Sequence, residues 1–168
     1  QYRLSTEGES VVPVWFVTNR KPDQKGGYTT ERDPGKNSYG RMDVSVGVAQ
    51  NHNVSKKHNQ EFKFVNKSED AFFDDINKRL EIFRKLGCTP QVLVNLHNYN
   101  VGFIDSLLNA SHCQEDLNVA GACISYSWPS VGRSGNYTSD YAGIERSEPE
   151  ILDFLLKAAK LCGQENIH

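Results

Sequence analysis

The sequence predicts an α/β fold, a mostly parallel sheet with helices on both faces. Beyond residue 66, apolar runs of strand length alternate with amphipathic helical segments, a pattern typical of parallel β–α–β units with right-handed crossovers. The central run, Val92 to Leu96, is short, apolar and contains β-branched residues, which favours a buried strand. A polar turn and an amphipathic helix follow it directly.

Two longer strands and one helix are expected before the central strand. The helix begins after Ser68, whose hydroxyl suits an N-cap, and it stops at Gly87. In chain order the expected elements are a polar arm at residues 1–11, a strand at 12–17, a long surface loop at 21–39, a strand at 42–48, a short edge strand at 61–65 and a helix at 69–86.

The second half continues as helix, strand, helix and the start of a strand. Apolar residues recur at three- and four-residue spacing from Phe103, and an apolar strand runs from Gly121 to Trp128. Ser147 and Glu150 have the spacing of a capping box, which predicts that the last helix begins there after a Gly/Ser-rich loop. Residues 165–168 resemble the first residues of one more strand.

Composition and charge exclude several classes of function. The 168 residues carry a net charge of -2 with both signs interspersed, so neither nucleic acid nor a membrane surface is an expected partner. No apolar run approaches the length of a membrane span. No histidine pair brackets a glutamate at H-x-x-x-H spacing and no C-x-x-C occurs, so no metal site and no cofactor is expected.

Four cysteines and four N-x-S/T sequons favour an extracellular or secretory-lumen location. An even number of cysteines without metal-ligand spacing is typical of disulfides, and the sequons would carry N-linked glycans. The alternative is a cytosolic protein with free thiols and unmodified asparagines. The cysteines are Cys88, Cys113, Cys123 and Cys162, and the sequon asparagines are Asn53, Asn66, Asn109 and Asn136.

Several linked motifs resemble a family of uncharacterised α/β-hydrolases that are esterase- or lipase-like. The family pattern combines a V-x-F-x-T-N-R strand, a Y-G-R-x-x-V-S-V strand, an H-G-Y-N turn and a W-P-S turn. The matching segments are Val14 to Arg20, Tyr39 to Val46, His97 to Asn100 and Trp128 to Ser130, and the stretch from Asp140 to Ser147 is also similar. The resemblance implies the N-terminal portion of an α/β-hydrolase fold, an incomplete domain at residues 12–168 that follows the arm at 1–11.

In that fold, the turn after the central strand donates a backbone N–H to the oxyanion hole, and the next strand leads into a nucleophile elbow. Here the turn is a degenerate His97-Asn98-Tyr99-Asn100, in which Asn98 stands in place of glycine. We expect this side chain to narrow the oxyanion hole, and asparagine to tolerate positive φ less well than glycine.

The resemblance places the nucleophile, the acid and the base beyond His168, and no G-x-S-x-G occurs in the sequence. No catalytic residue is therefore expected within this chain. Trp128, Pro129 and Ser130 could form a pocket rim at the carboxyl edge of the sheet, or Trp128 could simply pack against the neighbouring helix.

The strand order that the resemblance implies also suggests a disulfide pairing. With the central strand between those that begin near residues 121 and 165, Cys88 and Cys162 stand at the amino ends of adjacent parallel strands. The implied bridges are Cys88–Cys162 and Cys113–Cys123.

Two hypotheses of function remain open. In the first, the chain is a secreted, non-catalytic α/β-hydrolase-like glycoprotein that acts as a scaffold or self-assembling unit. Such a unit would form a homo-oligomer or filament through an exposed sheet edge near residues 92–97 or 165–168 and the arm at residues 1–11. In the second, the chain is the N-terminal part of a serine hydrolase whose nucleophile-bearing half is absent.

Overall fold

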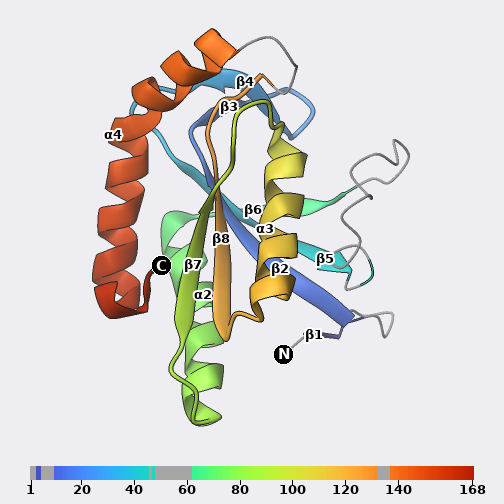
Figure 1. Ribbon diagram of the computed structural model, residues 1–168, viewed down its shortest axis with the longest axis vertical. Helices are drawn as coiled ribbons and strands as arrows, with labels where there is room; N and C mark the ends of the chain where they lie inside the picture. The colour runs from blue at the N-terminus through green and yellow to red at the C-terminus, as the bar shows by residue number, and fades with distance from the viewer. Residues whose placement is uncertain (1–2, 5–9, 46, 48–61, 132–136) are drawn as a thin grey trace.

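A single large sheet organises the protein in the computed structural model, which describes residues 3–4, 10–45, 47, 62–131 and 137–168 (Figure 1). The strands are β1 (Arg3–Leu4), β2 (Ser10–Thr18), β3 (Arg20–Pro22), β4 (Tyr28–Arg32), β5 (Ser38–Ser45), β6 (Phe64–Lys67), β7 (Gln91–Leu96) and β8 (Gly121–Ser127). The helices are α2 (Glu69–Lys85), α3 (Phe103–Leu117) and α4 (Tyr137–Cys162), and a 3₁₀ turn covers Gln164–Asn166.

The sheet is mixed, so the expectation of a mostly parallel sheet was wrong. Its order is β6-β5-β2-β8-β7, with β1 beside β2. The pairs β2–β8 and β7–β8 are parallel, whereas β1–β2, β2–β5 and β5–β6 are antiparallel. Parallel strands need a crossover, usually a helix, and residues 19–37 between β2 and β5 contain only a hairpin. The periodicity therefore indicated the parallel half correctly and missed the antiparallel half.

That hairpin occupies the segment that was expected to be a long surface loop. Strands β3 and β4 pair with Arg20 opposite Arg32. The turn between them is held by Asp23, whose carboxylate accepts hydrogen bonds from the backbone N–H groups of Lys25 and Gly27 at 2.8 and 2.7 Å. The sequence of this segment is mostly polar because the side chains of the two short strands are mostly half-buried or exposed, so no strand pattern was recognisable.

The strand order around β7 agrees with the one that the hydrolase resemblance implies. Ile167 forms a parallel bridge with Val92 on the side of β7 away from β8. The N–H of His168 donates to the carbonyl of Val92, and the N–H of Val94 donates to the carbonyl of His168, both at 2.9 Å. The central strand thus lies between β8 and an isolated parallel bridge at Ile167.

Helices cover both faces of the sheet, as predicted. On one face α2 and α4 pack against the strands, with Trp15, Ile124 and Tyr126 in the shared core. On the other face α3 packs over β2, β5 and β8, where Phe16 and Cys123 are fully buried. Ser68 caps α2 by accepting the N–H of Ala71 at 3.2 Å, as its position in the sequence predicted.

The last helix begins ten residues earlier than the capping-box pattern predicted. Helix α4 starts at Tyr137, and the Ser147 hydroxyl donates to the carbonyl of Gly143 within the same helix. Glu150 instead accepts hydrogen bonds from the Arg32 side chain at 2.6 Å and the Gly35 N–H at 2.7 Å. The predicted helix start was wrong because Glu150 lies in the middle of the helix, where it binds the β3–β4 hairpin and does not cap a helix end.

The N-terminal arm has a partner inside its own domain. Strand β1 pairs antiparallel with β2, with Arg3 opposite Val11, so these residues of the expected arm belong to the sheet of their own domain. The remaining residues of the arm before Ser10 lie outside the described residues.

All four cysteines are free thiols in the structure, so neither expected bridge is present. Cys123 lies in the core under α3, where its thiol donates to the carbonyl of Ala110 at 3.4 Å. Cys162 is buried with α2 and α4, whereas Cys88 is exposed. Burial raises the pKa of the Cys123 thiol to about 12 and that of Cys162 to about 11.

These thiols are therefore expected to differ in reactivity. In the folded protein at pH 8, iodoacetamide should modify Cys88 first and leave Cys123 unmodified for at least about a hundredfold longer, because only the thiolate reacts and Cys123 is both buried and protonated. Mass spectrometry of peptides from a labelling time course measures this. Equal labelling of the two cysteines would contradict the structure, and a Cys88–Cys162 peptide pair without reductant would support the pairing that the sequence suggested.

Two of the four sequon asparagines can be placed. Asn66 on β6 and Asn109 on α3 are exposed, so a glycan could extend into solvent from either, while Asn53 and Asn136 lie outside the described residues.

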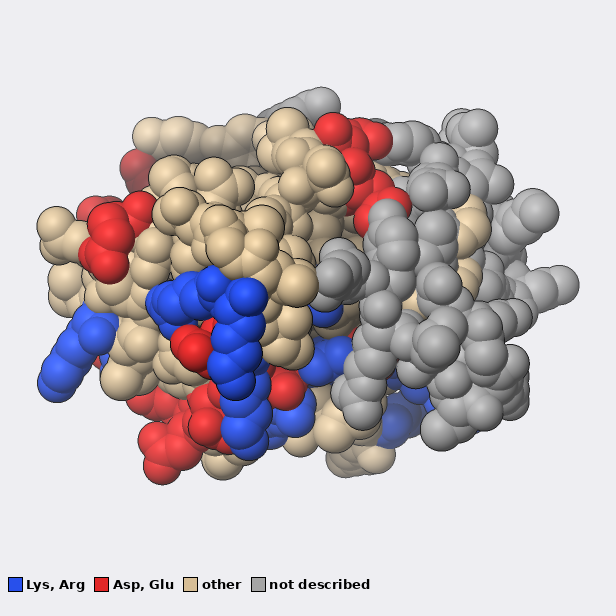
Figure 2. Space-filling view, turned by 90° about the horizontal axis from the view of Figure 1, so that it is seen from below, with Lys and Arg blue, Asp and Glu red and all other residues tan. Residues whose placement is uncertain are grey.

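Among the described helices, none combines the length and apolarity that crossing a bilayer requires. Figure 2 views the end of the molecule opposite the carboxyl ends of β7 and β8, where acidic and basic side chains are intermixed.

Candidate functional site

The loops after β2, β7 and β8 meet at one end of the sheet, beside the β3–β4 hairpin and the first turns of α3 and α4 (Figure 1). The carboxyl ends of parallel strands in an open α/β sheet are the usual place for a binding site. The polar turn that follows β7, residues 97–100, lies at this edge. The residues around this turn therefore determine whether this end of the sheet can form a binding site.

Arg20 joins the three loops from inside the protein. Its side chain is only 1% exposed, and it donates from Nε to the Ser127 hydroxyl at 3.0 Å, from Nη1 to the Ser130 carbonyl at 3.1 Å and from Nη2 to the Val101 carbonyl at 2.9 Å. Burial lowers the pKa of Arg20 to about 10, an effect that the charge of Asp140 partly opposes. The guanidinium is therefore still cationic at pH 7.

Asp140, from the first turn of α4, holds the end of the polar turn. Its carboxylate accepts the Ser130 hydroxyl at 2.6 Å, the Asn100 N–H at 2.7 Å and the Val131 N–H at 3.1 Å. Burial alone would raise the pKa of Asp140, but these hydrogen bonds lower it, so the carboxylate is ionised. The Ser130 hydroxyl in turn accepts the N–H of Val101 at 3.0 Å, so two successive amides of the turn are fixed.

His97 is a structural residue with a neutral ring at pH 7. It stacks on Trp128 with ring centroids 4.7 Å apart, and the indole N–H of Trp128 donates to the His97 carbonyl at 3.0 Å. The ring nitrogens lie 2.7 Å from the Asn98 carbonyl and 3.1 Å from the Trp128 carbonyl. Burial lowers the pKa of His97 to about 4, so the ring is neither a cation nor an available base at neutral pH.

The middle of the turn faces solvent, whereas His97 at its start is buried. Asn98 and Tyr99 are exposed, and the ring of Tyr99 meets Trp128 edge-on. Among the described non-glycine residues, positive φ occurs at Asn100 and Asn118, and not at Asn98. The expected backbone cost of Asn98 is therefore absent, and its side chain affects the turn through its bulk alone. Asn100, with φ of 64°, adopts the left-handed conformation, and its N–H donates to Asp140.

Trp128, Pro129 and Ser130, which were expected either as a pocket rim or as packing residues, are all buried. They support the turn from beneath. No local sequence pattern predicted a role for Arg20 or Asp140, although both fall within the family motifs. Arginine and aspartate are rarely buried, so the residue types of Arg20 and Asp140 did not predict a position inside the protein. The one available signal was their position, Arg20 at the end of one family motif and Asp140 at the start of another.

A polar hollow of about 380 Å³ adjoins the turn, between the end of β7 and the outer face of α3. Within the described ranges, no group of three or more metal-ligating side chains gathers here or elsewhere. The residues that line the hollow are Asn95, Leu96, His97, Asn98, Asn109, His112, Cys113 and Asp116.

Comparison with known proteins gives one match. Residues 68–168, more than half of the chain, match the family described as alpha/beta hydrolase of unknown function (DUF900). The matched range includes the polar turn, Ser130 and Asp140, while Arg20 precedes it. No curated protein and no solved structure matches the chain significantly.

Proposed function

The chain belongs to the alpha/beta hydrolases of unknown function, and from this membership we propose that it supplies the oxyanion side of a serine-hydrolase site for ester substrates. The observation that carries the proposal is the buried network in which Arg20 and Asp140 fix the turn after β7. In this fold that turn stabilises the negative charge that develops on the substrate oxygen.

The energetics of the network favour a positioning role. A buried cation and a buried carboxylate lose much of their hydration, and such groups often contribute little net stability compared with apolar residues of similar size. A fully hydrogen-bonded network does, however, rigidify the backbone that it contacts. Arg20 donates to the Val101 carbonyl, while Ser130 and Asp140 accept the N–H groups of Val101 and Asn100. An oxyanion hole requires preorganised donors, and the network would hold in place the rest of the turn, whose other N–H groups would face the substrate.

The turn divides into a fixed half and an accessible half. The amides of Asn100 and Val101 are already used within the protein, so a substrate would meet the exposed Asn98–Tyr99 segment. The Asn98 side chain would restrict that approach to slender, unbranched acyl groups. The neighbouring hollow of about 380 Å³ could receive the rest of the ester.

The parallel bridge at Ile167 indicates where a nucleophile would approach. Ile167 lies opposite Val92, so a strand that continued in this register would come level with His97 about five residues later. A strand-to-helix turn at that level would face the Asn98–Tyr99 segment. The 168 residues contain no G-x-S-x-G, so we assign the nucleophile to a segment outside this sequence.

A second candidate is a secreted, non-catalytic α/β-hydrolase-like glycoprotein that serves as a scaffold or self-assembling unit. Asn98 in place of the turn glycine favours this function, as do the exposed sequon residues Asn66 and Asn109. In this case the buried network would stabilise the fold and would no longer support a catalytic site.

Labelling with a fluorophosphonate separates the two candidates. The 168-residue chain is expected to hydrolyse no p-nitrophenyl butyrate and to take up no label, because it has no elbow serine. The product of the complete reading frame should be labelled at one serine after residue 168 and should hydrolyse the ester, and changing that serine to alanine should abolish both. Label on a serine within residues 1–168 would contradict the division of the site, and an unlabelled, inactive complete protein would leave the scaffold function.

A further inference from the structure

Strand β6 forms the edge of the sheet that lies opposite β7. Strand β6 pairs with β5 on one side, and no strand in the described part of the chain pairs with its other side. Its central residue, Val65, is 65% exposed, a high value for an apolar side chain in a strand. An unpaired strand edge offers backbone N–H and C=O groups to another extended chain.

Basic side chains alternate along the same face of this edge. Lys63 immediately precedes β6, and Lys63, Val65 and Lys67 point to one face because successive strand residues alternate. Arg41 of β5 lies opposite Val65 in the register. Together with Asp43 and Asp75 these residues line a hollow of about 380 Å³.

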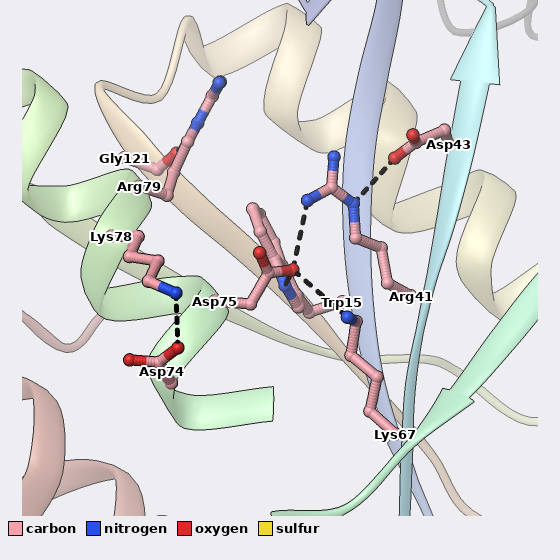
Figure 3. Close-up of polar contacts among 9 residues, drawn as sticks. All are labelled: Trp15, Arg41, Asp43, Lys67, Asp74, Asp75, Lys78, Arg79 and Gly121. Carbon is pink, nitrogen blue, oxygen red and sulfur yellow. Dashed lines mark hydrogen bonds and ion pairs between the residues drawn. The ribbon is translucent and has the colours of Figure 1, made fainter. Parts of the chain in front are cut away.

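Arg41 is held rigidly within this hollow (Figure 3). It donates from Nε to Asp43 at 2.7 Å and from Nη1 to Asp75 at 3.1 Å, and its guanidinium lies 4.9 Å from the centre of the Trp15 ring. Asp75 also accepts the Trp15 indole N–H at 2.9 Å, and its oxygen is 3.8 Å from Nζ of Lys67. Asp75 is thus shared between Arg41 and Lys67, and the three cations that line the hollow exceed its two carboxylates by one positive charge.

We propose that β6 binds an extended acidic segment of a partner protein by strand addition, with acidic side chains at alternate positions opposite Lys63 and Lys67 and an apolar side chain opposite Val65. Main-chain hydrogen bonds would give affinity, and the cross-strand pairs would give the sequence preference. This surface lies at the other edge of the sheet from the hydrolase-type turn, so the inference is independent of the proposed function.

The charge pattern disfavours a second copy of this chain as the occupant. Two β6 strands paired antiparallel about Val65 would place Lys63 of each copy opposite Lys67 of the other. Like charges directly opposite one another destabilise a strand pair, and inward-pointing lysines are a common means of blocking edge-to-edge association. An acidic segment removes this penalty and a basic segment does not.

The sequon residue on β6 does not obstruct this face. Asn66 accepts a hydrogen bond from the Tyr28 hydroxyl at 2.7 Å, and Tyr28 packs against Phe103 on the α3 side of the sheet. A glycan on Asn66 would therefore begin on the opposite face from Lys63 and Lys67.

Fluorescence anisotropy with short labelled peptides tests the proposal on the 168-residue protein. A peptide with the core Glu-Thr-Val-Thr-Glu should bind the wild-type protein, and Lys63→Glu/Lys67→Glu should weaken its binding by roughly tenfold or more. The same double variant should gain binding to Lys-Thr-Val-Thr-Lys. Lys160→Glu, an exposed change on α4 with half the charge difference, should leave binding of the acidic peptide within about twofold.

A third peptide separates strand addition from simple charge attraction. Glu-Pro-Val-Pro-Glu keeps both acids but lacks the N–H groups that would face Phe64 and Asn66, whose backbone groups point away from β5, so it should bind much more weakly. If the proline peptide binds as tightly as the acidic peptide, charge attraction alone explains binding and strand addition is overturned. If inorganic phosphate displaces both peptides, the surface is an anion site, which also overturns strand addition. No binding of the acidic peptide at millimolar concentration, or a concentration-dependent dimer that Val65→Lys abolishes, would also overturn the proposal. Circular dichroism confirms that each variant is folded.

Discussion

Replacing Arg20 with methionine is expected to lower the free energy of unfolding by about 3 to 5 kcal/mol. The substitution keeps an unbranched side chain of comparable length but removes the donors to the Ser127 hydroxyl and to the carbonyls of Val101 and Ser130. These acceptors would remain buried without their partner, and Asp140 would lose the favourable charge of Arg20. Urea denaturation monitored by tryptophan fluorescence measures the loss.

Lys21→Met is the matched control for this substitution. Lys21 is adjacent in the chain and also cationic, but its side chain is 49% exposed and its partner Glu31 is 70% exposed. An exposed ion pair contributes at most about 1 kcal/mol, so the control should change the free energy of unfolding little. Equal effects of the two substitutions would contradict the role assigned to Arg20.

His97 is expected to make the protein less stable in mild acid. Burial lowers its folded-state pKa to about 4, whereas an unfolded histidine titrates near 6.5. Between these values the unfolded chain binds a proton that the folded protein does not, so stability falls as pH decreases from 6.5 to 4. The linkage amounts to about 3 kcal/mol for this shift, and it should be fully expressed at or below pH 4.

The contribution of His97 is isolated by comparing urea denaturation of the wild type and His97→Gln at pH 7 and pH 4. Other groups titrate in this range, so the difference between the two proteins is the relevant quantity. His97→Gln should lose about 3 kcal/mol less than the wild type on acidification. His168→Gln, which changes an exposed histidine, should behave as the wild type does. An unchanged pH dependence in His97→Gln would contradict a buried, neutral His97.

The elements with strong periodicity could be predicted from the sequence alone. The central strand, its flanking helices and the N-cap at Ser68 were identified because apolar spacing and local capping chemistry determine them. The bridge between Ile167 and Val92 agrees with the strand order that the family resemblance implied.

The elements that depend on distant contacts could not be predicted in this way. The β3–β4 hairpin is polar and gains stability from Glu150, more than a hundred residues later. For the same reason Glu150 was misread as part of a helix cap. Local patterns report on neighbours within a few residues, and these contacts join segments that no local pattern links.

The candidate site shows the same division. The turn at residues 97–100 was found from the sequence because it interrupts an apolar strand. Arg20 and Asp140 were missed because burial of a charge depends on partners from other elements, here the Val101 carbonyl and the Ser130 hydroxyl.

Amide hydrogen exchange at Asn100 and Val101 tests whether Asp140 and Ser130 hold the turn in one conformation. Both amides should exchange far more slowly than an unstructured chain, since each donates to a side chain that is itself buried. Asp140→Asn should speed exchange at Asn100 while the amides of β7 remain protected. Exchange of Asn100 and Val101 in the wild type at the rate of an unstructured peptide would contradict a preorganised turn.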